Sequence, residues 1–209
     1  MLKTGLLGGS FNPAHRGHRR ITAHALRVLE LDEVWWLVSP GNPLKPGAGM
    51  APLPARFRSA RTAAAGLPVR VTAIERELGT RYTVDTLVAL RRRFPDRQFI
   101  WLMGADNLAQ FHAWRRWRQI ASTLPIAVIA RPGYDGGAQI APAMGWLRRF
   151  VRPAGQVRHW TQWRAPALVL LRLPPDPTSA TGIRAVDPDW HQQHISGTLR
   201  DGVTRRLLA

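Results

Sequence analysis

Strand-like apolar runs and helix-like amphipathic stretches alternate along most of this chain, and this alternation limits the possible folds more than any other feature. Strands that alternate with helices predict a parallel sheet covered by helices on both faces. We therefore predict an α/β fold: a Rossmann-like, doubly wound, mostly parallel sheet that binds its ligands beyond the carboxyl ends of the strands. The predicted strands are 2–7, 34–38, 69–73, 99–103, 126–130 and 168–173, and the predicted helices lie near 21–29, 55–65, 84–94, 114–122 and 143–150.

The length and apolar content favour one domain over residues 1–209. With 209 residues, of which 45% are apolar, the chain can bury one substantial core. Between residues 132 and 166 the pattern weakens into Gly, Pro, Trp and Arg. We expect an irregular or mobile excursion there, and not a separate domain.

Composition excludes several kinds of chemistry and leaves one broad class of partner. The chain has no cysteine, which excludes disulfides, thiolate nucleophiles and cysteine-ligated metals. Its net charge of +17 calls for anionic partners, such as nucleic acid or phosphorylated small molecules. All basic residues except Lys3 and Lys45 are arginines, so a compositional bias explains the charge equally well. No run approaches the roughly 20 apolar residues of a membrane helix, and we expect a cytoplasmic protein with no membrane partner.

The segment after the first predicted strand carries the strongest functional signal. Residues 8–18 read Gly-Gly-Ser-Phe-Asn-Pro-Ala-His-Arg-Gly-His. Glycines such as Gly8 and Gly9 let a backbone approach phosphate closely, and the start of the following helix offers N–H groups and a positive dipole end. His15 and His18 are three residues apart, so both imidazoles can face one anion. An isolated histidine is usually a surface or core residue, but this pair after a glycine turn favours an anion site.

Absent motifs narrow the reaction further. The sequence contains neither the phosphate loop G-x-x-x-x-G-K-[ST] nor the dinucleotide fingerprint G-x-G-x-x-G. It also offers no recognisable pairing of a nucleophile with a base. A reaction in which both substrates bring their own reactive groups fits better.

Residues 8–18 resemble the signature of the HxGH nucleotidyltransferases, and their Gly-Gly-Ser-Phe-Asn-Pro form resembles the bacterial nicotinate-nucleotide adenylyltransferases. Three later segments match that family in the same order. They are Tyr-Thr-Val-Asp-Thr at 82–86, Gly-Ala-Asp-Asn at 104–107 with Trp114 downstream, and Thr-Ser-Ala-Thr-Gly-Ile-Arg at 178–184. The last segment departs from the family's Ile-Ser-Ser-Thr-x-Ile-Arg at its first and third positions, and the tail beyond it matches poorly.

The resemblance implies adenylyl transfer from MgATP to nicotinic acid mononucleotide, which yields nicotinic acid adenine dinucleotide and pyrophosphate in NAD biosynthesis. It implies that His15 and His18 act as catalytic donors to the triphosphate. Thr83, Trp114 and Arg115 would bind the acceptor. The residues expected to hold ATP and its phosphates are Gly8, Gly9, Ser10, Phe11, Lys45, Gly104, Asp106, Ser179, Thr181 and Arg184.

Several of these residues have ordinary structural alternatives. Lys45 could be a solvated loop residue, and Asp106 could cap a helix. The turn that contains Ser179 could be a helix N-cap. Trp114 could pack into the core with Trp117, three residues later.

Two other functions also remain open from the sequence. One is another HxGH enzyme, which would act on nicotinamide mononucleotide or phosphopantetheine. The other is a basic nucleic-acid-binding protein that uses its nine tryptophans for stacking. The glycine turn and the paired histidines argue against nucleic acid as the partner.

Overall fold

A computed structural model describes residues 1–41, 49–130, 140–174, 176, 178–194 and 197–208. Its central sheet has six strands, all parallel, in the order β3-β2-β1-β4-β5-β6. The strand order reverses between β1 and β4, where a parallel sheet opens a crevice for ligands. The predicted fold class is confirmed. The strands are β1 (Leu2–Gly9), β2 (Glu33–Val38), β3 (Val69–Thr72), β4 (Arg97–Gly104), β5 (Ile126–Ala130) and β6 (Leu168–Arg172).

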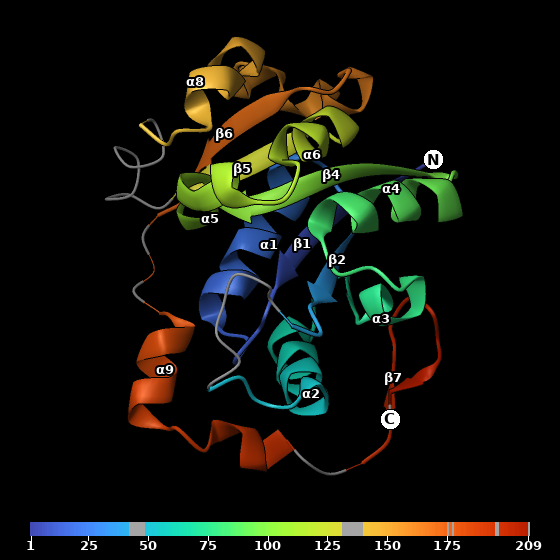
Figure 1. Ribbon diagram of the computed structural model, residues 1–209, viewed down its shortest axis with the longest axis vertical. Coiled ribbons are helices and arrows are strands. Elements are labelled where there is room, and N and C mark those ends of the chain that lie inside the picture. Colours follow the sequence, from blue (N-terminus) through green and yellow to red (C-terminus); the bar gives the residue numbers. More distant parts are fainter. Residues whose placement is uncertain (42–48, 131–139, 175, 177, 195–196, 209) are drawn as a thin grey trace.

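Helices cover both faces of the sheet. In Figure 1, α4 (Thr83–Arg93), α5 (Ala105–Gln110) and α6 (Trp117–Thr123) lie in front of the sheet and α1 (Arg16–Val28) lies behind it. The front core also takes in α8 (Met144–Leu147), while α2 (Leu53–Ala64) and the 3₁₀ helix η3 (Ala154–Gln162) join α1. Each face thus has its own hydrophobic core.

The strands supply both cores because successive side chains point to opposite faces. In β2, Trp35 and Leu37 enter the front core, whereas Val34, Trp36 and Val38 enter the core behind the sheet. All five are buried, so this strand reads as a continuous apolar run, as expected for a strand covered on both sides.

The sequence-based prediction was wrong for several short elements. The helix predicted from residue 114 begins only at Trp117, because Arg116 before it takes a left-handed conformation with φ of 51°. Between β4 and α6 the chain instead forms α5 and η1 (Phe111–Ala113). Other elements that the periodicity did not indicate are α3 (Ile74–Leu78), η3, η4 (Trp190–His194), β7 (Leu199–Arg200) and β8 (Leu207–Leu208). Where the sequence predicted a helix near 143–150, the structure has α8 followed by the 3₁₀ helix η2 (Arg148–Phe150).

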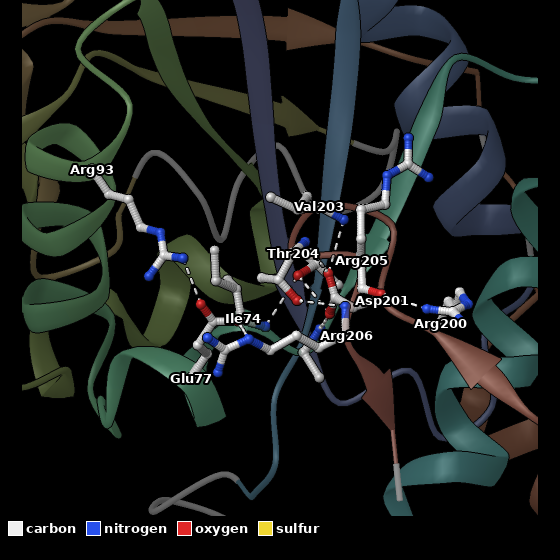
Figure 2. Close-up of polar contacts among 11 residues, drawn as sticks. Ile74, Glu77, Arg93, Arg200, Asp201, Val203, Thr204, Arg205 and Arg206 are labelled. Carbon is white, nitrogen blue, oxygen red and sulfur yellow. Dashed lines mark hydrogen bonds and ion pairs between the residues drawn. The ribbon is translucent and has the colours of Figure 1, made fainter.

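The C-terminal segment packs against the corner between β3 and α3. The Asp201 carboxylate, 3% exposed, accepts hydrogen bonds from Thr72 Oγ1 at 2.9 Å and from Ala73 N at 2.7 Å. Figure 2 shows its further bonds from Val203 N and Thr204 N, at 2.8 and 2.9 Å. One buried carboxylate thus joins the tail to the edge strand of the sheet.

We predict that Asp201→Ala lowers the free energy of unfolding by about 3 kcal/mol, because it leaves four donors without their acceptor. For a chain of this size that corresponds to a fall in Tm of roughly 10 °C, measurable by thermal denaturation. Asp189→Ala, at an exposed position, is the control and should leave Tm unchanged. A parental Tm in Asp201→Ala would show that the carboxylate does not hold the tail.

The structure also bears on membrane insertion. Among the residues described, no helix is both long and apolar enough to span a bilayer.

Candidate active site

The start of α1 brings the two motif histidines together. His15 caps α1, and its Nδ1 accepts a hydrogen bond from Gly17 N at 3.1 Å. In return, His15 N donates to Nδ1 of His18 at 3.2 Å. The two ring centroids lie 4.0 Å apart. The spacing predicted this pairing, and the reciprocal caps at the N-terminus of α1 supply its physical cause.

These caps also determine the tautomer of both rings. A backbone N–H can only donate, so Nδ1 of each ring must be the acceptor. A neutral imidazole with an accepting Nδ1 carries its proton on Nε2. His15 and His18 therefore each present an Nε2–H donor, which suits an anionic ligand.

The turn between β1 and α1 is held tightly. Phe11 is 1% exposed, has a φ of 48°, and stacks on Trp36 with ring centroids 5.1 Å apart. Gly8 and Gly9 precede it at the carboxyl end of β1. A Cβ on Gly8 would lie 2.6 Å from Cη2 of Trp101, so only glycine leaves room for that indole. Close packing around Gly8 and Phe11 therefore fixes the backbone of this turn.

Arg184 connects the segment at 178–184 to the motif at 8–18. This residue lies on α9 (Ala180–Val186), and its Nη1 donates to the carbonyl of Asn12 at 2.5 Å. Its Nη2 donates to Thr181 Oγ1 at 3.3 Å. Ser179 caps α9 by accepting a hydrogen bond from Gly182 N at 3.0 Å. This is the helix N-cap that the sequence left open as the alternative role of this turn. Two segments more than 160 positions apart thus meet beside the histidines.

A buried carboxylate fixes the approach to α9. Asp176 accepts from Thr178 N at 2.9 Å and from Arg20 Nη1, on α1, at 3.1 Å. Hydrogen bonds from Thr178, together with the Arg20 cation, hold the pKa of this carboxyl well below its usual range. Asp176 is therefore ionised at neutral pH and links the last motif to α1.

The residues expected to bind ribose and the acceptor lie at the end of β4, at the start of α4 and between η1 and α6. Asp106 is exposed in the first turn of α5, and a Cβ on Gly104 would lie 2.3 Å from its Oδ1. Trp114 is half-buried and packs edge-on against Phe111, with centroids 5.5 Å apart. The Arg115 guanidinium lies 4.6 Å from the centre of the Tyr82 ring.

This last contact joins two of the predicted motifs. Tyr82 immediately precedes Thr83, the first residue of α4. The Arg115 contact therefore brings the segment around Thr83 to the segment around Trp114. Lys45 lies outside the described residues, so its role stays a prediction.

Some buried polar residues around the site were missed by sequence reasoning. Asn12 bonds Gly49 O and Ala51 N, and Arg56 bonds backbone carbonyls under the turn. Glu75, on α3, accepts from Thr86 at 3.1 Å, and burial raises its pKa to about 7. Asn12 stands in the motif at 8–18 without having been assigned a role, and Arg56 and Glu75 belong to no motif of the sequence. The described residues contain no group of three or more His, Asp or Glu side chains suited to a metal.

The fold and this site define a class of protein. A parallel α/β sheet with a glycine turn and two imidazole donors at its switch point is typical of enzymes that handle nucleotide phosphates. The family model described as cytidylyltransferase-like matches residues 6–186. The class is thus that of the nucleotidyltransferases.

Curated relatives identify the family within that class. A probable nicotinate-nucleotide adenylyltransferase of Erythrobacter litoralis is 62% identical over 99% of this chain and 94% of the relative. One of Parvibaculum lavamentivorans is 54% identical over 88% and 91%. The chain belongs to the nicotinate-nucleotide adenylyltransferase family.

Solved structures agree on the fold. The nicotinic acid mononucleotide adenylyltransferase of Plasmodium falciparum, solved in complexes with APC and with NaAD, aligns with a TM-score of 0.63 at 13% identity. The alignment covers 88% of this chain and 83% of that one. At this identity the likeness concerns the arrangement of the sheet and helices alone.

Proposed function

We propose that this chain joins the AMP part of ATP to nicotinic acid mononucleotide. A phosphate oxygen of the acceptor attacks the α-phosphorus and forms a new P–O bond. The bond from that phosphorus to the oxygen bridging to the β-phosphate breaks, and pyrophosphate leaves with the electron pair. The observation that carries this proposal is the pair of Nε2–H donors of His15 and His18, held at the start of α1 beside Arg184.

Catalysis of such a step depends on positioning and on neutralising charge that spreads over the phosphates. His15 and His18 donate to phosphate oxygens, and the N–H groups of Ser10 and Phe11 hold the chain of phosphates. Arg184 binds the β- and γ-phosphates through its planar fork of donors, a role supported by its contact with the carbonyl of Asn12 in the turn. The two histidine rings and Arg184 are already oriented by hydrogen bonds to the chain, so these side chains need little reorganisation.

The remaining ATP contacts are proposed from the ends of β1, β4 and α9. Gly8 and Gly9 allow the turn to approach the nucleotide, and Asp106 beside Gly104 accepts from ribose hydroxyls. Ser179 and Thr181 can donate their hydroxyl protons to phosphate while they accept their present bonds. Mg²⁺ arrives as part of the MgATP substrate, held by phosphate oxygens and water, and we assign it no protein ligand.

The acceptor pocket is proposed where the segment at 82–86 meets the segment around Trp114. Trp114 stacks on the pyridine ring, a role supported by its being only half-buried between Phe111 and Trp101. Thr83 and the backbone around Arg115 donate to the ring carboxylate. A pocket of donors in a positive field suits a carboxylate better than a neutral amide.

We predict a preference for nicotinate over nicotinamide mononucleotide of about ten- to a hundredfold in kcat/KM, because the amide's NH₂ would face a second donor. The measurement is pyrophosphate release with MgATP and each mononucleotide. Thr83→Val should reduce the preference, whereas Thr83→Ser, which keeps the hydroxyl, should retain it. Trp114→Ala should raise KM for both acceptors and leave their ratio unchanged. Equal use of the two acceptors by the parent enzyme would refute the assignment of the acceptor while leaving adenylyl transfer intact.

A further inference from the structure

Arg56, on α2, is a cation buried beneath the turn that follows β1. It is 1% exposed, and among the described residues its guanidinium donates to backbone carbonyls alone. Nη1 bonds the carbonyls of Ser10 and Ser39, both at 2.7 Å, while Nη2 bonds Pro40 O at 3.2 Å and Nε bonds Ala51 O at 2.8 Å. One side chain thus joins the turn after β1, the end of β2 and the approach to α2.

This cation has no carboxylate partner among the described residues. Arg97, which is half-buried, is by contrast paired with Glu33. Burial lowers the pKa of Arg56 to about 10, which still leaves it charged at neutral pH. A buried charge without a counter-ion is costly, and carbonyl dipoles compensate it only in part. An anion bound on the far side of the turn would complete the compensation.

The geometry of the turn places such an anion opposite Arg56. The peptide bond between Ser10 and Phe11 is trans, because the cis bonds of the described chain lie elsewhere. In a trans peptide the carbonyl oxygen and the following N–H point in opposite directions. Since Arg56 donates a hydrogen bond to the Ser10 carbonyl, the N–H of Phe11 points away from Arg56. The positive φ of Phe11 is a strained conformation that persists only when its surroundings enforce it.

We propose that Arg56 is a positioning residue for the triphosphate of ATP: it turns the Ser10–Phe11 peptide toward the phosphates and attracts them with its buried charge. The proposal rests on the function proposed above for this turn. Arg56 does not touch the nucleotide and acts through the peptide that separates them. Because Arg56 is buried, its attraction is screened less than that of a charge on the surface.

The test measures binding of MgATP and of adenosine, each without an acceptor, by calorimetry. Arg56→Gln removes the charge and keeps an amide donor, whereas Arg56→Lys keeps the charge and loses most of the carbonyl bonds. We expect Arg56→Gln to raise the Kd of MgATP by about tenfold and to leave the Kd of adenosine nearly unchanged, since adenosine lacks phosphates. Arg56→Lys should restore MgATP binding to within about threefold of the parent value.

Arg58→Gln is the matched control. Arg58 lies on the same helix and also donates to backbone carbonyls, those of His194 and Gly197, but not to the turn after β1. It should leave both dissociation constants unchanged.

Two outcomes would overturn the proposal. The first is that Arg56→Gln weakens adenosine and MgATP in equal proportion, as a purely structural tie would. The second is that Arg56→Lys folds with a parental Tm and still loses MgATP tenfold; this comparison decides the matter even if Arg56→Gln does not fold. Because no acceptor is present, a failure of adenylyl transfer would be seen separately, in pyrophosphate release by the parent enzyme.

Discussion

Replacement of His18 by alanine is expected to lower kcat by about a hundredfold or more in a protein that remains folded. The His18 ring presents an Nε2–H donor, because its Nδ1 accepts from His15 N. A preorganised donor aimed at developing charge contributes about this much to the rate, since it stabilises the transition state more than the ground state. The measurement is pyrophosphate release at saturating MgATP and nicotinic acid mononucleotide.

His18 also caps α1, so its two roles must be separated. His18→Asn keeps an acceptor near His15 N but has no donor at the position of Nε2, and it should retain the parental Tm while kcat still falls. His24→Ala, on the same helix, is the matched control and should leave kcat unchanged. Near-normal turnover in folded His18→Ala would remove the histidine pair from the mechanism.

Removal of the Arg184 guanidinium is expected to weaken MgATP binding by about a hundredfold and acceptor binding far less. A guanidinium that binds phosphate through two parallel hydrogen bonds contributes charge as well as geometry, and an alanine supplies neither. Calorimetric Kd values for MgATP, together with KM for nicotinic acid mononucleotide, measure the two effects. Arg184→Lys should fall between the parent and Arg184→Ala, because a point charge lacks the planar fork.

Arg184 also ties α9 to the turn through the carbonyl of Asn12, and a general loss of structure must be told apart from a loss of phosphate binding. Arg200→Ala, in the C-terminal hairpin, removes the same charge far from this contact and should leave both substrates unaffected. An equal loss for MgATP and the acceptor in Arg184→Ala would indicate a folding role in place of a phosphate contact.

Local patterns were sufficient to predict the sheet and its main helices. All six predicted strands overlap observed ones, because the apolar runs are long enough to be buried on both faces. Short elements were missed where tertiary contacts stabilise them. Examples are α3, fixed to the C-terminal tail by Asp201, and η3, held by the bond from Trp160 Nε1 to Leu29 O.

The sequence alone predicted the fold class, which the structure confirms, and it named the side chains that we propose for the site. The glycine turn and the paired histidines indicated an anion site by their spacing, whereas the roles of Thr181 and Arg184 came from the family resemblance. The sequence also indicated that the His15 and His18 rings can face one ligand, and the structure places the two rings side by side. It could not indicate how their tautomers are set, because that depends on which backbone N–H groups the helix start leaves available.

Only the tertiary structure decided which groups from distant parts of the chain lie in contact. Arg184 meets Asn12 across more than 160 positions, Arg115 meets Tyr82, and Arg56 places a charge under the turn after β1. None of these contacts follows from periodicity, since each joins elements that are separated in the chain and brought together by the parallel sheet. The sequence therefore specified the donors, and the folded protein decided how they are oriented and which segments they join.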